Sequence, residues 1–167
     1  MNRRGIFSIS AITAVGLALL PGSTFAQQKS LKDQLVGTWT LVSCDSTDAS
    51  GAKAPYCVNP IGILMLDAGG RFASVIAARG RPKSGDRVKA PAEVIKTASL
   101  GFAANFGTWS VNEADKTITT RYQGALTPDI EGADFKRPVN LVGDELKVVG
   151  SIPVVGGRAE AVYRRAK

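Results

Sequence analysis

The feature that most constrains the fold is a succession of short segments, from about residue 36 onward, in which apolar and polar residues alternate. Such alternation is typical of strands, because successive side chains of a strand point to opposite faces of its sheet. Clusters of turn residues divide the segments from one another. Eight strands are predicted, at residues 36–44, 61–67, 71–78, 107–112, 116–123, 135–142, 145–150 and 158–165.

Short links between these segments predict antiparallel neighbours. The runs Asp67–Arg71, Asn112–Lys116 and Val142–Glu145 contain Gly, Asp or Asn, as hairpin turns do, and Gly69-Gly70 and Gly156-Gly157 are interpreted as turns as well. Eight antiparallel strands with little helix would leave open edges unless the sheet closed on itself. We therefore expect a mainly β, eight-stranded antiparallel barrel, with room inside for side chains or for one small ligand.

One segment departs from the alternation and is predicted to be a helix. Residues 92–105 follow Pro91 and precede Gly107, and Glu93 stands in the first turn, which is the usual punctuation of a helix. This helix is expected to cover one end of the barrel. Its apolar face would comprise Val94, Ile95, Ala98, Phe102 and Phe106.

The segment 79–91, just before that helix, is basic and punctuated by Gly and Pro, and it is too long for a tight turn. Two interpretations stay open. The segment is either a mobile flap over the barrel mouth or an ordinary solvated loop.

The first 26 residues have the three parts of a secretory signal peptide. Arg3 and Arg4 form a basic start, residues 6–20 are uncharged, and Ala26 is a small residue at a suitable cleavage site. The apolar run is shorter than the roughly 20 residues that a membrane anchor needs. We expect a cleaved signal, a periplasmic or secreted protein without a stable membrane anchor, and one mature domain over residues 27–167. The paired arginines leave the twin-arginine route open beside the ordinary one.

Charge and cysteine usage agree with export. Removal of Arg3 and Arg4, with no acid lost, lowers the formal net charge of +7 by two, to +5. No dense basic block interleaved with aromatic residues follows, so nucleic acid is not an expected partner.

The only two cysteines, Cys44 and Cys57, enclose a polar, loop-like run. In an oxidising compartment they are expected to form a disulfide, which would contribute on the order of 3 kcal/mol.

The chain contains no histidine, which limits its chemistry. A Ser-His-Asp triad, a Cys-His dyad and a His-ligated metal site are all excluded. Phosphate-binding loops, dinucleotide fingerprints and nucleophile elbows are absent from the sequence as well. We therefore assign no catalytic residue, no metal and no cofactor.

Several motifs together resemble those of the bacterial lipocalin-like domain family. Gly37-Thr-Trp39 is similar to the Gly-x-Trp signature of lipocalins, and the resemblance extends over nearly all of residues 31–165. The motifs are Leu35–Ser43, Asn59–Leu64, Gly70–Phe72, Phe106–Val111, Pro128, Gly132, Arg137 and Leu141–Leu146. The resemblance implies that Trp39 packs inside the closed end of the barrel beneath an arginine of the last strand, in a structural role. That arginine is Arg165 or Arg164, and Arg165 is favoured because alternation places it on the same face as Tyr163. Family members often carry a His where this chain has Thr119–Arg121, so an activity that needs that His is not expected here.

Alternation assigns the side chains that face the barrel interior. Among them Arg137 stands on an otherwise apolar face, between Phe135 and Val139. A charge in that position is costly unless it is paired. It either pairs at the mouth with an acid (Asp129, Glu131 or Asp134) or holds the carboxylate of a ligand, with Thr120 and Tyr122 assisting. The candidate ligand-binding residues are Phe72, Ile76, Phe102, Thr120, Tyr122, Phe135, Arg137 and Val139.

Three functions follow from this reading. The leading hypothesis is an exported module that binds a small apolar or amphipathic molecule, with or without a carboxylate, in the barrel. A small barrel enzyme (an isomerase, cyclase or hydrolase) would need two carboxylates converging in the cavity, and the acids that can be placed lie in turns. The third is an interaction module of the cell envelope whose barrel is filled by its own side chains. The many small residues predicted for the interior disfavour it, because they leave space. The sequence makes no prediction of oligomeric state.

Overall fold

The computed structural model describes residues 29–152 and 157–167, so the predicted signal peptide at 1–26 and the turn residue Gly156 lie outside the described residues. The strands are β1 (Gly37–Thr47), β2 (Pro60–Leu66), β3 (Arg71–Ala78), β4 (Phe102–Asn112), β5 (Thr117–Ala125), β6 (Asp134–Val142), β7 (Glu145–Ile152) and β8 (Gly157–Arg165). The helical elements are α1 (Leu31–Leu35), α2 (Ala92–Leu100) and two 3-10 turns, η1 (Pro55–Cys57) and η2 (Pro128–Ile130). No helix in this described part is long and apolar enough to cross a membrane.

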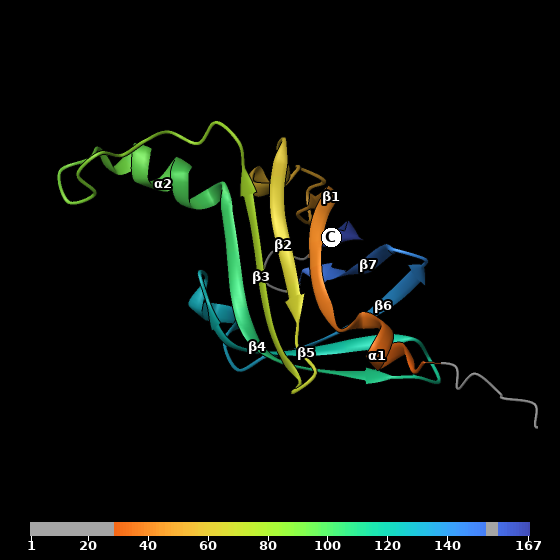
Figure 1. Ribbon diagram of the computed structural model, residues 1–167. Coiled ribbons are helices and arrows are strands. Elements are labelled where there is room, and N and C mark those ends of the chain that lie inside the picture. The colour runs from red at the N-terminus through yellow and green to blue at the C-terminus, as the bar shows by residue number, and fades with distance from the viewer. Residues whose placement is uncertain (1–28, 153–156) are drawn as a thin grey trace, which may run out of the picture.

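The eight strands form a closed antiparallel barrel, as predicted (Figure 1). Each strand pairs with the next along the chain, and β8 returns to pair with β1. The sheet has no open edge, because the last strand pairs with the first. The predicted turns between β2 and β3, β4 and β5, and β6 and β7 are all confirmed.

The predicted helix over 92–105 is five residues too long, since α2 ends at Leu100. Phe102 and Phe106 belong to β4, where they pair with Ala77 and Ala73 of β3. Backbone pairing with a neighbouring strand outweighs the helical spacing of a few apolar residues, because tertiary context overrides local preference. The remaining α2 has no buried residue and projects from one end of the barrel (Figure 1).

The two ends of the barrel differ in their connections. At one end, which we call the closed end, the links after β2, β4 and β6 are short turns, and α1 lies beside the start of β1. At the other, open end, the links are longer: residues 48–59 carry η1, 79–101 carry α2, and 126–133 carry η2. Access to the interior is therefore expected from the open end.

Trp39 plugs the closed end. Its indole is fully buried, and its Nε1 donates a 2.9 Å hydrogen bond to the carbonyl oxygen of Leu35 in α1. The guanidinium of Arg165 lies 4.2 Å from the centre of the Trp39 ring. Arg165 also donates hydrogen bonds to the carbonyl oxygens of Val36 (3.1 Å) and Gln34 (2.6 Å). One side chain thus covers the tryptophan and ties down the end of α1, which is the geometry that the resemblance implies for this pair.

A second tryptophan is anchored at the same end, where Trp109 Nε1 donates a 3.0 Å hydrogen bond to the carbonyl oxygen of Asp67. The prediction that a strand begins at Gly107 is wrong, because Gly107 lies midway along β4, at a register shift against β5. A Cβ at this position would collide with the carbonyl oxygen of Arg121. Glycine is therefore needed for close backbone approach rather than for a strand start.

Cys44 and Cys57 form the expected disulfide, with their Cα atoms 5.2 Å apart. The bond attaches η1 to β1 at the open end, and both cysteines are buried. Ser46 and Tyr56 share a 2.9 Å hydrogen bond on the same connection. This part of the rim is consequently held in place by one covalent and one polar link.

We expect Arg165→Met to lower the free energy of unfolding by about 2–4 kcal/mol, since it removes a cation–π contact and two charged hydrogen bonds. Arg164→Met is the matched control. Arg164 is exposed and lies 3.9 Å from Glu145, so its loss should cost less than about 1 kcal/mol. Urea denaturation of both variants measures the difference, and equal costs would contradict the structural role of Arg165.

Candidate functional site

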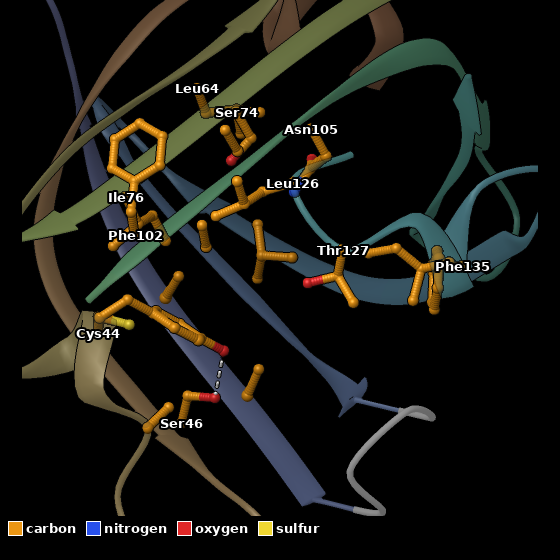
Figure 2. A pocket seen from close by; sticks show the side chains of 18 of the residues that line it. Cys44, Ser46, Leu64, Ser74, Ile76, Phe102, Asn105, Leu126, Thr127 and Phe135 are labelled. Carbon is orange, nitrogen blue, oxygen red and sulfur yellow. Dashed lines mark hydrogen bonds between the residues drawn. The ribbon is translucent and has the colours of Figure 1, made fainter. Parts of the chain in front are cut away.

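The barrel encloses a cavity of about 490 Å³ that opens at the end carrying η1, α2 and η2. Figure 2 shows side chains of β1 to β4, of β6 and of the connection after β5 around this space, and residues of the other strands line it as well. Much of the wall is apolar, with Leu64, Ile118 and Leu126 among its members. A filled, solid core is thereby contradicted, and the barrel has room for a small molecule.

Seven of the eight candidate ligand-binding residues lie in the wall of this cavity: Phe72, Ile76, Phe102, Thr120, Tyr122, Phe135 and Arg137. The eighth, Val139, is buried in the core and does not line the cavity. Phe102 reaches the wall from β4 rather than from a helix. The structure thus brings these side chains together, and binding itself stays a prediction.

Alternation explains why the polar members of this group face inward. On β5, Ile118, Thr120 and Tyr122 are buried, whereas Arg121 and Gln123 are exposed. The Tyr122 ring packs between two others, with centroid distances of 5.5 Å to Phe72 and 4.5 Å to Phe135. An aromatic cluster therefore forms one side of the cavity wall.

Arg137 projects into this cluster. Its Nη1 donates a 3.2 Å hydrogen bond to Thr120 Oγ1, and its Nη2 donates a 3.4 Å hydrogen bond to the Tyr122 hydroxyl. Its guanidinium carbon lies 4.8 Å from the centre of the Phe135 ring. Because both hydroxyl oxygens act as acceptors towards Arg137, the Tyr122 hydroxyl proton remains free to be donated to a ligand.

Two of the three acids that the sequence offered as partners of Arg137 are engaged elsewhere. Asp134 lies 3.4 Å from Arg121 on the outer surface, and Glu131 accepts a 3.0 Å hydrogen bond from the backbone N–H of Ala125. None of the salt bridges between described residues includes Arg137. Its positive charge thus faces the cavity with neutral partners only.

Gly150 on β7 provides the room for this side chain. A Cβ at Gly150 would lie 2.7 Å from Cγ and 2.8 Å from Cδ of Arg137. The arginine therefore runs over the space that any other residue at position 150 would fill. Sequence reasoning missed this relation, because it depends on a contact between two strands rather than on a local pattern.

Tyr163 was missed as a wall residue, although its alternation with Arg165 placed it on the inner face of β8. It is 4% exposed, and burial raises its pKa to about 12. A hydrogen bond with Ser74 and the positive charge of Arg137 act in the opposite direction, towards a lower pKa. Tyr163 thus joins Ser74 and the Arg137 group into one polar region of an otherwise largely apolar cavity.

The cavity wall, within the described residues, contains two acids, Asp48 and Glu160. Asp48 accepts hydrogen bonds from the backbone and side chain of Ser50, and these hydrogen bonds lower its pKa. Glu160 forms ion pairs with Lys147 and Arg158. Both carboxylates are thus occupied by structural contacts, and no observation favours the carboxylate enzyme.

The fold and the cavity together define a small barrel of the lipocalin type. A model of the family described as lipocalin-like domain matches residues 36–162. The chain belongs to this lipocalin-like domain family.

Two solved structures are similar to the chain. One is described as a de novo designed fluorescence-activating β-barrel, 12% identical, covering 83% of this chain and 99% of its own, with a TM-score of 0.44. The other is a mutant of the fluorescent protein UnaG, 17% identical, covering 80% of this chain and 97% of its own, with a TM-score of 0.37. No curated protein matches the sequence.

The raised pKa of Tyr163 predicts a loss of stability in alkali. The folded protein holds this proton more tightly than the unfolded chain, so its contribution is complete below the ordinary pKa of 10 and is lost as pH rises towards 12. Between pH 9 and pH 11.5 the wild type should lose about 2 kcal/mol more than Tyr163→Phe. Urea denaturation at both pH values measures this, and parallel losses would contradict it.

Proposed function

We propose that this protein is an exported carrier that binds a small amphipathic acid in its barrel, with the acid group on Arg137. The observation that carries the proposal is the position of Arg137, a permanent cation that faces the cavity and contacts only neutral groups. An inward charge without a counter-charge costs free energy that a ligand carboxylate would offset. The planar guanidinium fork also matches a carboxylate geometrically.

The remainder of the cavity suits the apolar part of such a ligand. Its volume of about 490 Å³ lies within the range of small-molecule sites. Phe72, Ile76 and Phe102 supply apolar wall, while Tyr122 and Thr120 stand beside the arginine. An apolar cavity with a few convergent polar groups is the usual design of a site that fixes both affinity and orientation.

The open end favours the approach of an anion. The segment 79–101 carries six basic residues, Arg79, Arg81, Lys83, Arg87, Lys89 and Lys96, against two acids, Asp86 and Glu93. The guanidinium of Arg81 lies 4.7 Å from the centre of the Phe102 ring in the cavity wall. A positive region around a mouth raises the local concentration of negatively charged ligands. The segment 79–101, whether flap or solvated loop, would then attract an anionic ligand to the mouth of the cavity.

The test compares dodecanoic acid with dodecanol, two probes of equal chain length of which one carries a carboxylate. We expect the wild type to bind the acid more tightly. Arg137→Met should weaken acid binding by about 10- to 100-fold, as expected for the loss of a charge-assisted hydrogen bond, and leave the alcohol unchanged. Isothermal titration calorimetry measures each affinity.

Arg121→Met is the matched control, because it removes the same charge from a residue on the outer surface of β5. It should retain acid binding. Gly150→Ala keeps every charge but displaces the Arg137 side chain, and should weaken acid binding as well. If Arg137→Met or Arg137→Ala binds acidic apolar probes as the wild type does, the proposed site is wrong.

Export is the second part of the proposal. It is supported by the tripartite pattern of residues 1–26 and by the disulfide, which is typical of oxidising compartments. Expression of the full sequence in a bacterial host should yield a periplasmic or secreted protein whose mass begins at Gln27. Intact mass spectrometry of the cell fractions checks this, and an uncut cytoplasmic product with free thiols would contradict it.

A further inference from the structure

The outer surface of the barrel is unusually apolar on one side. Ile61, Ile63 and Met65 point outward from β2 and are 42%, 40% and 46% exposed. They stand in rows with neighbours on the adjacent strands, since Ile63 pairs with Val75 of β3, and Met65 pairs with Ala73, which in turn pairs with Phe106 of β4. Six residues define this outer apolar face: Val42, Ile61, Ile63, Met65, Val75 and Phe106.

No helix of the described chain covers these strands, and α2 leaves the barrel beyond the end of β3 (Figure 1). The sequence of β2, Pro-Ile-Gly-Ile-Leu-Met-Leu, is apolar on both faces. A strand of that composition is typical of a sheet that is covered on both sides, whereas a half-exposed strand alternates. The composition therefore indicates that something packs against the outside of β2.

The other half of the barrel has the opposite character. Every salt bridge between described residues outside the segment 79–101 joins residues between positions 115 and 165. Lys147 with Glu160, and Lys136 with Asp115, bridge neighbouring elements there. On β1 to β4 the charged residues are Arg71, at the closed end, and the exposed Asp45, three positions after Val42. The surface is thus divided into a half with many charges and a half with two.

The size of the outer apolar face fits a protein interface. Five of its side chains are 40–51% exposed. At roughly 150–200 Å² for each complete side chain, they present on the order of 400 Å² of apolar surface. Thr38, Thr40, Ala73 and Thr108, which lie beside them on the outer surface, extend this area towards the roughly 800 Å² that each partner contributes to a standard interface.

We propose that the outer apolar face joins two copies of this chain into a homodimer. Two copies of one uncharged, gently curved sheet surface can pack face to face around a two-fold axis, as the sheets of a sandwich do. A net positive charge would oppose association through the charged half, and the interface contains none of those charges. The open ends of both barrels, with their basic segments, stay free in such a dimer.

An anionic lipid bilayer is the alternative partner of the outer apolar face, and the positions of the Lys and Arg residues disfavour it. A membrane-binding face carries Lys and Arg around its apolar part, where they meet lipid phosphates. Here the basic segment 79–101 lies at the open end, and the ion-paired residues occupy the opposite half. Arg71 is the one cation of β1 to β4 beside the outer apolar face, which is fewer than such a rim contains, so a second protein surface of the same character matches it better.

The experiment measures the mass of the purified protein by sedimentation velocity between about 1 and 100 µM, because the fraction of dimer depends on protomer concentration. The wild type is expected to dimerise. Ile63→Lys places two like charges in the symmetric interface and should raise the dimer dissociation constant by at least about tenfold. Val142→Lys is the control, since Val142 is 68% exposed on β6 in the charged half, and it should dimerise as the wild type does.

Circular dichroism of Ile63→Lys checks that the barrel is intact, and Met65→Lys provides an independent disruption if Ile63→Lys does not fold. A wild type that stays monomeric at the highest concentration overturns the proposal. So does equal dimerisation of Ile63→Lys and Val142→Lys. Flotation with phosphatidylglycerol vesicles adds a third outcome: a monomer that binds vesicles through Ile63 would assign the face to a membrane and also overturn the dimer.

Discussion

The structure depends on the pairing of β1 with β8, which closes the sheet. In this seam the Cα partners of Trp39, Leu41 and Cys44 are Arg165, Tyr163 and Ala161. The register that pairs the backbones of β1 and β8 also places Arg165 over Trp39 at the closed end. It sets Tyr163 in the cavity wall as well. A shift of one residue would turn every inward side chain of β8 to the surface. The register that closes the barrel therefore also determines which side chains of β8 line the cavity.

The difference between the two ends of the barrel determines where a ligand site can form. Tight turns and the two anchored tryptophans fill the closed end, whereas long connections surround the open one. The disulfide fixes one of these connections to β1, so part of the rim is rigid. The cavity opens at this end, between the rigid part of the rim and the basic segment 79–101, and Arg137 lines it.

Much of this architecture could be predicted from the sequence, because alternation is a local signal with a direct structural cause. It placed the eight strands, and it assigned Thr120 and Tyr122 to the face that lines the cavity. Three features escaped it. Phe102 and Phe106 have helical spacing but are held in β4 by pairing with β3, and Gly107 marks a close approach to β5. The space over Gly150 exists only where β6 and β7 meet, and no local pattern records it.

Two departures from the usual pattern of a β-barrel remain after folding is explained. Arg137 is a charged residue on the inner side of the barrel, where apolar residues are expected. The Ile and Met residues of the outer apolar face are exposed on the outer side, where polar residues are expected. Each lowers the stability or solubility of an isolated, empty barrel. Such local conflicts concentrate at functional sites in natural proteins. Arg137 and Ile63 lie on opposite faces of the sheet, so a ligand in the barrel and a partner on its outer surface would each remove one conflict independently of the other.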